Sequence, residues 1–246
     1  MEAIFEKKYT VQVNDIDFRQ QLKLSSLFVY LQDMATEHGY KIGVGRAVLQ
    51  EKYGIIWVLS RVRVDILRYP RFNEEITIET WPEQPGKLEF KRNFIIYDKN
   101  NNIIAKAISQ WVLIDFNTRK LRRSTILEEK FPNSDRECAI EYNFGKIKPI
   151  GSLVLSYKKT VGYSDIDLNE HLNNAKYIDY IMDCFTLEEH KKHFVRSIEI
   201  NYLHEALPGD TIELYTDTTG AKNNNVYIEG VNESTKLTTF KAQIII

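Results

Sequence analysis

An internal repeat is the feature of this sequence that most restricts its fold. The segment NDIDFRQQLKLSSLFVYLQDM at residues 14–34 aligns without gaps with SDIDLNEHLNNAKYIDYIMDC at residues 164–184, so that Asp15 falls on Asp165. Self-similarity at a fixed offset is typical of a chain built from copies of one structural unit. We therefore expect the second half of the chain to repeat the fold of the first.

The hydrophobic pattern within each half changes from a helical period to an extended one. Apolar residues between positions 24 and 35 recur at spacings of three and four, which predicts an amphipathic helix. The segment WVLSRVRVDI then alternates with a period of two, and EEITIETW, LEFKRNFIIY and IIAKAISQWVLID continue in the same manner. Each half is therefore predicted to be one helix followed by antiparallel strands, an α+β arrangement.

The weakest pattern lies between the two halves. Charged residues, proline and glycine are scattered over residues 125–151 without a helical or extended period, which predicts a connector. We accordingly expect an N-terminal domain at residues 1–124 and a C-terminal domain at residues 152–246.

The charge balance and the cysteines argue against several classes of protein. Thirty-three basic and 34 acidic residues give a formal net charge of -1, so no overall field favours nucleic acid or an anionic membrane. No segment approaches the roughly 20 apolar residues of a membrane span, and the start, MEAIFEKKYTVQV, lacks a signal-peptide pattern, so we expect a cytoplasmic protein. Cys138 and Cys184 stand alone, which argues against a disulfide framework or a zinc site. We expect neither a metal nor an organic cofactor.

Polar residues are concentrated in the second copy of the repeat, in DIDLNEHLNN. Polar and apolar positions alternate there, which predicts an extended segment whose Asp167, Asn169 and His171 side chains point the same way. Asn173 or Asn174 is placed to cap the helix that follows. Free N–H groups at a helix start carry partial positive charge and can stabilise a developing oxyanion. A base, an orienting acid and an oxyanion site can thus be assembled within a few residues.

The same residues also suit an ordinary turn, because Asp and Asn commonly form turns and helix caps. The repeat helps to decide between a catalytic site and an ordinary turn. Asp17 matches Asp167, so this aspartate can serve the fold in both halves, whereas the first half carries Arg19 and Gln21 in place of the later Asn and His. The difference favours one catalytic copy and one structural copy.

At these residues the sequence resembles a known family, the acyl-acyl-carrier-protein thioesterases of the plant FatA and FatB type and their bacterial relatives. DIDLNEHLNNAKYIDY is very close to the family signature D-x-D-x-N-x-H-x-N-N-x-K-Y. WVLSRVRVDILRYPRFNEEITIETW and SQWVLIDFNTRKLRR are similar to two further family segments, so the resemblance covers nearly the whole chain. It implies a tandem double hotdog fold, in which each half is a long helix wrapped by an antiparallel sheet. It also implies hydrolysis, in fatty-acid biosynthesis, of the thioester that joins a fatty acyl chain to acyl carrier protein.

The resemblance also assigns catalytic residues. The Asp, Asn and His of the family fall on Asp167, Asn169 and His171, and its catalytic Glu falls on Glu205 in NYLHEALPGD. The family segment around that Glu is R-R-E-C, whereas this chain reads L-H-E-A, so Ala206 stands where plant members carry Cys. No cysteine nucleophile is available at that position, and a mechanism based on water is implied.

Two other functions stay open from the sequence: a hotdog thioesterase acting on coenzyme A esters, and a non-catalytic acyl-binding module that senses lipid. Acyl carrier protein is the expected partner, and a homodimer is an open alternative to a monomer. The first half lacks the catalytic Asn and His, so its interior is free to bind the acyl chain. The residues predicted to line that interior are Leu27, Phe28, Leu31 and Met34.

Overall fold

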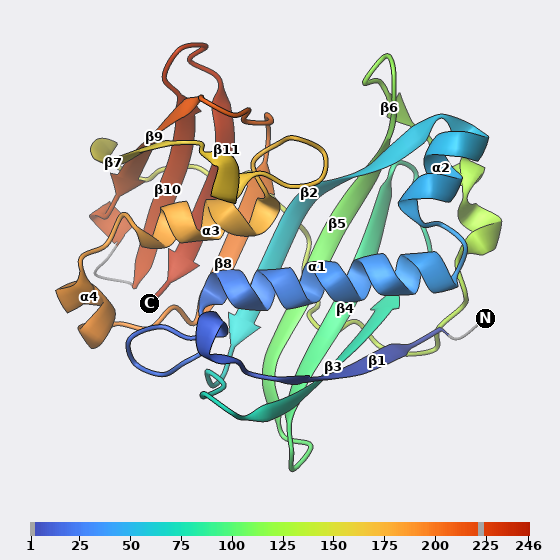
Figure 1. The fold of residues 1–246 in the computed structure, drawn as a ribbon, viewed down its shortest axis with the longest axis horizontal. Helices are drawn as coiled ribbons and strands as arrows, with labels where there is room; N and C mark the ends of the chain where they lie inside the picture. Colours follow the sequence, from blue (N-terminus) through green and yellow to red (C-terminus); the bar gives the residue numbers. More distant parts are fainter. Residues whose placement is uncertain (1–2, 221–223) are drawn as a thin grey trace. The chain divides into compact units, whose positions relative to one another are not determined.

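The protein is described by a computed structural model that covers residues 3–220 and 224–246. Its residues group into two compact units, Val29–Asn143 with the segment before Leu24, and Phe144–Ile246. The division falls inside the first long helix, whose first turn, Leu24–Phe28, groups with the second unit. Each unit contains an antiparallel sheet and a helix that lies across it (Figure 1). None of the helices in the described ranges combines the length and the apolar character that a membrane crossing requires.

The first unit is built on a sheet with the strand order β1-β3-β4-β5-β2, in which every neighbouring pair is antiparallel. A short strand, β6, pairs with the end of β5. The strands are β1 (Phe5–Thr10), β2 (Ile55–Ile66), β3 (Glu75–Pro82), β4 (Glu89–Asp98), β5 (Ile103–Asp115) and β6 (Leu121–Arg122), and the helices are α1 (Leu24–Lys41) and α2 (Arg46–Tyr53).

Helix α1 covers the inner face of this sheet because its apolar residues form one stripe. Leu31 and Met34 on this stripe are 5 and 0 % exposed. Tyr30 stacks on Tyr9 of β1 with ring centres 4.4 Å apart. Full burial of one such apolar side chain stabilises a fold by about 1.5–3 kcal/mol, so the stripe fixes the helix against the sheet.

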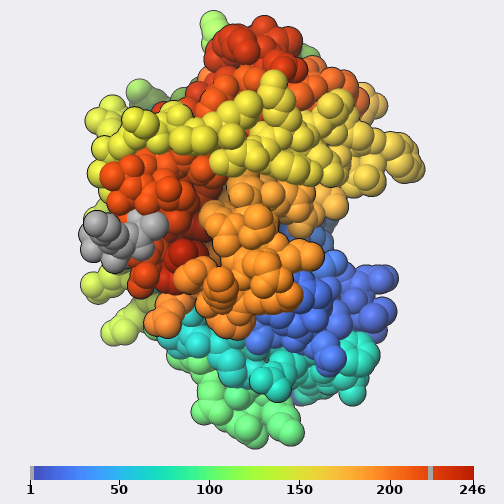
Figure 2. All heavy atoms as spheres, turned by 90° about the vertical axis from the view of Figure 1, so that its left-hand side faces the viewer, coloured from blue at the N-terminus to red at the C-terminus, as the bar shows by residue number. Residues whose placement is uncertain are grey.

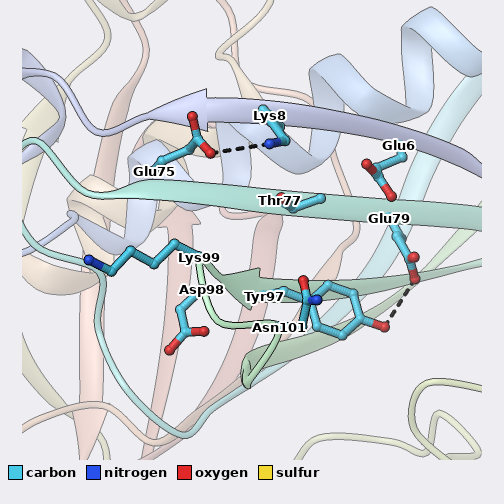
Figure 3. Close-up of a pocket in the computed structure, with 9 residues that line it drawn as sticks. All are labelled: Glu6, Lys8, Glu75, Thr77, Glu79, Tyr97, Asp98, Lys99 and Asn101. Atoms are coloured by element: carbon cyan, nitrogen blue, oxygen red, sulfur yellow. Dashed lines mark hydrogen bonds and ion pairs between the residues drawn. The ribbon is translucent and has the colours of Figure 1, made fainter.

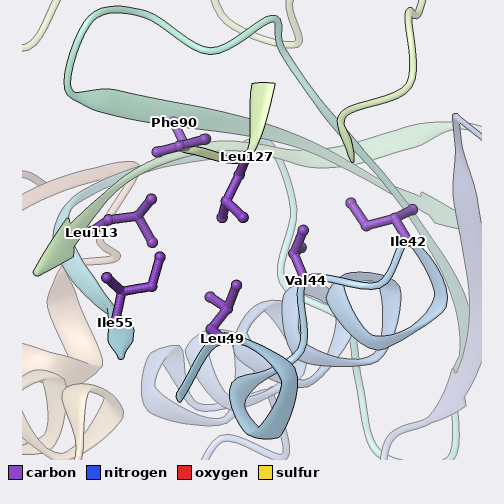
Figure 4. Close-up of a cluster of buried hydrophobic side chains, with 7 residues drawn as sticks. All are labelled: Ile42, Val44, Leu49, Ile55, Phe90, Leu113 and Leu127. Atoms are coloured by element: carbon purple, nitrogen blue, oxygen red, sulfur yellow. The ribbon is translucent and has the colours of Figure 1, made fainter. Parts of the chain in front are cut away.

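A cluster of buried apolar side chains fills the end of the first unit that lies beyond α1. In Figure 4 these side chains converge from α2, from the loop before it and from three strands. Leu127, which lies in the stretch predicted to be a connector, is 1 % exposed and packs into this cluster. The cluster consists of Ile42, Val44, Leu49, Ile55, Phe90, Leu113 and Leu127.

Residues 136–139 pack on the outer face of the same sheet. The Ala139 N–H donates to Asn93 Oδ1 of β4 at 2.9 Å, and the Arg136 guanidinium lies 4.8 Å from the ring centre of Trp81. Part of the stretch predicted to be a connector therefore belongs to the packing of the first unit.

Polar side chains of β1, β3 and β4 line a shallow hollow elsewhere on this outer face (Figure 3). Its volume is about 410 Å³. Lys8 Nζ lies 3.3 Å from Glu75 Oε1, and the Tyr97 hydroxyl donates to Glu79 Oε2 at 3.0 Å. Its polar groups pair with one another, as is usual for a solvated surface.

The second unit has the strand order β8-β11-β10-β9-β7, again with antiparallel neighbours. The helix α3 lies across this sheet in Figure 1, and it has half the length of α1. The predicted α+β fold, with a helix wrapped by an antiparallel sheet in each half, is confirmed. The elements are β7 (Val154–Thr160), α3 (Asn174–Met182), α4 (Leu187–Lys192), β8 (Ser197–Tyr202), β9 (Thr211–Asp217), β10 (Asn225–Asn232) and β11 (Thr238–Ile245).

Strand β7 is the edge of this sheet, and the polar segment follows it directly. Val154 and Leu155 on β7 are 63 and 45 % exposed. Figure 2 shows the yellow and amber part of the chain, which includes β7, as a continuous band on the surface. The segment that was singled out in the sequence is therefore accessible from solvent.

The repeat predicted from the sequence is confirmed at the level of hydrogen bonds. Asp15 Oδ2 accepts from the Gln12 N–H at 2.9 Å and from the Tyr30 hydroxyl at 2.6 Å. In the second half, Asp165 Oδ2 accepts from the Gly162 N–H and from the Tyr180 hydroxyl, both at 3.0 Å. Each aspartate therefore ties the end of the first strand to the helix of its own unit.

The start of α3 is capped as predicted, because Asn173 Oδ1 accepts from the Ala175 N–H at 2.9 Å. Lys23, which holds the same position before α1, makes no such side-chain bond. We expect Asn173→Ala to lower the free energy of unfolding by about 1 kcal/mol, the usual contribution of an N-cap. Urea denaturation followed by circular dichroism measures this, with Lys23→Ala as the matched control. Equal losses in the two variants would contradict the assignment of the cap.

Candidate active site

The polar segment of the second half folds as a tight turn, so the predicted extended conformation is wrong. Ile166 and Leu172 form an antiparallel bridge, and the chain between them must therefore reverse direction. The Asp167 N–H donates to the His171 carbonyl at 2.9 Å, and the Glu170 N–H donates to the Asp167 carbonyl at 3.0 Å. Glu170 has a φ of 63°, which is the left-handed conformation that such a reversal requires. The alternation of polar and apolar residues reflected turn chemistry rather than a strand.

The carboxylate of Asp167 organises this turn. Its Oδ1 accepts from the N–H of Asn169 at 2.7 Å and from the N–H of His171 at 3.4 Å. Its Oδ2 accepts from the Asn169 side-chain amide at 3.2 Å. Asp167 thus holds both the backbone and the side chain of Asn169, and the second N–H of that amide remains able to donate to a substrate.

Glu205 lies close to His171 because a hydrogen bond joins the turn to the loop after β8, two segments that are distant in the sequence. The Leu172 N–H donates to the Ala206 carbonyl at 2.9 Å, which draws the loop after β8 against the turn. Glu205 Oε2 then lies 3.2 Å from His171 Nε2. The side chains of His171 and Glu205 are 28 and 44 % exposed, so water can reach the pair.

The loop that carries Glu205 is itself fixed by the adjoining strand β11. The N–H groups of Leu203 and His204 both donate to the Thr239 carbonyl, at 2.8 and 3.1 Å. The His204 ring bonds the neighbouring Thr238 carbonyl through Nδ1 at 2.8 Å. The residues that replace the two family arginines therefore help to hold the position of Glu205.

The turn of the first half has the same backbone geometry. Asp17 Oδ1 accepts from the N–H groups of Arg19 at 2.8 Å and Gln21 at 3.2 Å. Gln20 has a φ of 60°, matching the left-handed residue of the second turn. The aspartate of the turn therefore has a structural role in both halves.

The side chains on the first turn differ from those of the second. Arg19 Nη2 lies 2.7 Å from Asp17 Oδ2, so the first turn closes on an ion pair. The Leu22 N–H donates to the Pro70 carbonyl at 2.8 Å, as Leu172 does to Ala206, which places Tyr69 where the second half has Glu205. This supports the interpretation that only the second copy carries the catalytic groups. Sequence reasoning did not identify Tyr69 as this counterpart, although aligning the ends of β2 and β8 would have done so.

The start of α3 offers fewer free N–H groups than the sequence suggested. Ala175 donates to the Asn173 side chain, and the Lys176 N–H donates to the Asn173 carbonyl at 2.8 Å. The carbonyl of Asn174 accepts from the Tyr202 hydroxyl at 3.0 Å. The Asn169 amide is therefore a better candidate than the helix start for polarising a carbonyl group.

A hollow of about 740 Å³ opens beside the turn. Tyr163 at its edge is 98 % exposed, and Asp167 lies in its wall. Tyr177 is buried on α3 behind the turn, and burial raises the pKa of its hydroxyl, so this group stays neutral near the site. The lining residues are Tyr163, Ser164, Ile166, Asp167, Glu170 and Pro208.

Cys138 and Cys184 form no disulfide. Burial raises the pKa of Cys184 to about 12, and burial together with Glu83 raises the pKa of Cys138. Both thiols are therefore protonated at neutral pH and are poor nucleophiles. Within residues 3–220 and 224–246, no three His, Cys, Asp or Glu side chains are grouped as a metal ion would require.

The fold and the site together define a tandem hotdog protein whose second unit presents an Asp-Asn-His turn to a glutamate. Residues 2–130 match the family model of the acyl-ACP thioesterase N-terminal domain, and residues 153–246 match that of the acyl-ACP thioesterase C-terminal domain. The chain therefore belongs to the acyl-ACP thioesterase family.

Individual relatives agree with this assignment. Oleoyl-acyl carrier protein thioesterase 2 of Arabidopsis thaliana is 25 % identical over 94 % of this chain, and the palmitoyl-acyl carrier protein thioesterase of the same plant is 25 % identical over 92 %. The chain spans 67 and 58 % of the lengths of these two plant proteins.

Solved structures extend the comparison to the fold. The crystal structure of an acyl-ACP thioesterase from Bacteroides thetaiotaomicron superposes with a TM-score of 0.88 and 28 % identity, covering 99 % of this chain and 97 % of that one. The 12:0-ACP thioesterase from Umbellularia californica shares the fold with a TM-score of 0.84 at 18 % identity, covering 100 and 97 % of the two chains.

Proposed function

We propose that this protein hydrolyses the thioester between a fatty acyl chain and acyl carrier protein, releasing a free fatty acid for lipid metabolism. The observation that carries the proposal is the approach of His171 Nε2 to Glu205 Oε2 at 3.2 Å, on the turn that also carries Asn169. Membership of the acyl-ACP thioesterase family supports this substrate, as does the Bacteroides relative of nearly the same length.

The chemistry needs no Ser or Cys nucleophile, because a thioester is already activated towards attack by water. Glu205 and His171 hold the water and take its proton while the water oxygen bonds to the carbonyl carbon. The Asn169 amide donates to the carbonyl oxygen as negative charge develops on it. The carbon–sulfur bond then breaks, and the Glu205–His171 pair returns the proton to the leaving sulfur.

Glu205 is assigned as the base in preference to Asp167. Both oxygens of Asp167 already accept N–H groups from the turn, whereas Glu205 faces the imidazole of His171. Asp167 therefore serves to orient Asn169 and His171. An attack by a carboxylate on the substrate, giving a transient anhydride, is the alternative to direct attack by water.

Two other functions compete with this proposal. A coenzyme A thioesterase would use the same catalytic groups, so only the carrier of the acyl chain separates the two. A non-catalytic acyl-binding module would need an apolar interior alone. The pairing of His171 with Glu205 at an accessible site argues against a module that only binds.

We expect the purified protein to release free fatty acid from acyl carrier protein faster than from the matching coenzyme A ester. The measurement incubates the protein with one panel of acyl chains on both carriers and identifies the released acids by mass spectrometry. Added chelator is expected to leave the rate unchanged. Turnover abolished by a chelator and restored by zinc would contradict the mechanism, and faster release from coenzyme A would favour the alternative carrier.

Replacing the proposed catalytic groups singly by alanine is expected to lower kcat by about 100-fold or more, as loss of a general base or an oxyanion donor commonly does. The residues are Asp167, Asn169, His171 and Glu205. Arg19→Ala and Gln21→Ala change the equivalent turn of the first half and should retain most of the activity. Near-normal kcat in all four catalytic variants, with the fold intact by circular dichroism, would show that the site is elsewhere.

We propose further that the acyl chain lies along the stripe of α1. Leu27, Phe28, Leu31 and Met34 are all buried, at 5 % exposure or less. Each buried methylene is worth about 0.8 kcal/mol, so blocking the stripe should disfavour long chains severalfold per lost CH₂. Leu31→Trp and Met34→Trp are therefore expected to shorten the released acids, as measured by gas chromatography.

The matched controls for this expectation lie in the second half. Ile178 and Ile181 are both fully buried on α3, the helix equivalent to α1. If enlarging these two residues changed the product profile, while folded and active α1 variants kept the parent profile, the acyl chain would belong to the second half.

A further inference from the structure

A hairpin with a strong local charge stands at one end of the sheet of the first unit. It joins β5 to β6, and its residues 116–123 read FNTRKLRR, with four basic side chains and no acidic one. The formal net charge of the whole chain is -1, so this charge is a local feature. Figure 1 shows the hairpin, which carries the label β6, projecting past α2. We call residues 115–123 the basic hairpin.

The single carboxylate of the basic hairpin is used within the hairpin itself. Asp115 Oδ1 accepts from the Thr118 N–H at 2.9 Å, and Asp115 Oδ2 lies 2.9 Å from Arg122 Nη1. Lys120 and Arg123 are exposed, and neither of them forms an ion pair with any residue that the structure describes. Their two charges are therefore available to an anionic partner.

Two exposed apolar side chains lie on one face of the same hairpin. Leu121 pairs directly with Ile114 of β5, so these two side chains share a face. The Phe116 N–H donates to the Gly54 carbonyl at 2.9 Å, which continues the ladder between β2 and β5. Phe116 comes two residues after Ile114 and therefore points to that face as well. Leu121 and Phe116 are 58 and 43 % exposed.

The end of α2 extends this surface at the base of the hairpin. Lys52 and Tyr53 come directly before Gly54, whose carbonyl binds Phe116. Lys52 is exposed, and Tyr53 is 37 % exposed. Basic and apolar side chains are thus interleaved from the base of the hairpin to its tip.

The shape and size of this surface indicate the kind of partner. A stable protein interface takes about 20–30 residues from each side, whereas the basic hairpin has nine and projects from the sheet. A bilayer surface asks for less, because a few apolar side chains enter the headgroup region while basic side chains meet anionic lipids. The observations therefore favour a lipid surface over a protein.

We propose that the basic hairpin docks this protein on anionic lipid bilayers. Phe116 and Leu121 enter the headgroup region, and Lys120 and Arg123 lie against the lipid phosphates. The inference is independent of the proposed function, because it concerns where the protein binds and not what it hydrolyses.

The first test is flotation of the purified protein with vesicles of phosphatidylcholine, alone or with about one third phosphatidylglycerol. We expect binding to the mixed vesicles that weakens with salt, and little binding to the neutral ones. Replacing both Lys120 and Arg123 by Gln should weaken binding about 25-fold, or about fivefold for each basic residue. Lys99→Gln is the matched control and should keep the binding, because Lys99 is an exposed lysine in the hairpin between β4 and β5. Absence of binding to the mixed vesicles, or equal loss in the control, would overturn the proposal.

A second test asks whether the tip enters the bilayer. Phe116→Trp places an indole on the proposed inserting face, and phosphatidylglycerol with brominated acyl chains quenches indoles that enter the lipid. We expect its fluorescence to be quenched more strongly than that of the wild type, which has three tryptophans of its own. Lys99→Trp should match the wild type. If quenching of Phe116→Trp does not exceed that of Lys99→Trp, the hairpin does not insert and the proposal is wrong.

Activity measurements separate lipid docking from docking of a protein. The Gln variants of Lys120 and Arg123 are expected to keep the wild-type kcat/KM towards acyl carrier protein in the absence of vesicles. If kcat/KM fell about 25-fold while the wild type ignored anionic vesicles, the basic hairpin would belong to a protein partner instead. A protein that bound vesicles but hydrolysed no thioester would contradict the proposed function and leave the lipid docking intact.

Discussion

The site of this protein depends on one side chain that shapes a turn. Asp167 accepts the N–H groups of Asn169 and His171, and the hydrogen bond from Leu172 to the Ala206 carbonyl then fastens the turn to the loop after β8. His171 and Glu205 are 34 residues apart in the sequence. Without these hydrogen bonds, nothing in the local structure would bring their side chains into contact. The carboxylate that shapes this turn thus sets the geometry of the proposed catalytic groups. Groups held in place in this way lose little entropy when substrate binds.

The two copies of the repeat show how a fold can keep its backbone structure while the chemistry of its side chains changes. The first turn keeps the aspartate and the left-handed residue, yet Arg19 closes on Asp17 and leaves no carboxylate opposite Gln21, since Tyr69 stands there. This ion pair stabilises the turn, but its carboxylate is already bound to the guanidinium and cannot act as a free base. The two turns therefore share the same backbone geometry, and of the two only the second has an accessible imidazole beside a carboxylate.

The interior of the first unit departs from a purely apolar core. The polar group formed by Arg92, His38 and Thr80 spans α1, β3 and β4, between side chains that otherwise exclude water. Buried polar groups are costly when unsatisfied, so such a group restricts what the interior can hold.

The sequence by itself determined the two-unit plan, the helix and strands of each half, a helix cap at Asn173 or Asn174 and the family, because hydrophobic periods and repeated motifs are local properties of the chain. It also placed Asp167, Asn169 and His171 in one segment, but it predicted an extended strand there, since alternation of polar residues has the same period in a strand as in this turn. Glu205 was found only through the family resemblance, because a glutamate in a loop carries no local signal. The contact between Glu205 and His171 and the burial of Arg92 beside His38 and Thr80 were decided by tertiary structure alone. Each depends on hydrogen bonds and packing between residues that are distant in the sequence, and no local pattern encodes such distances.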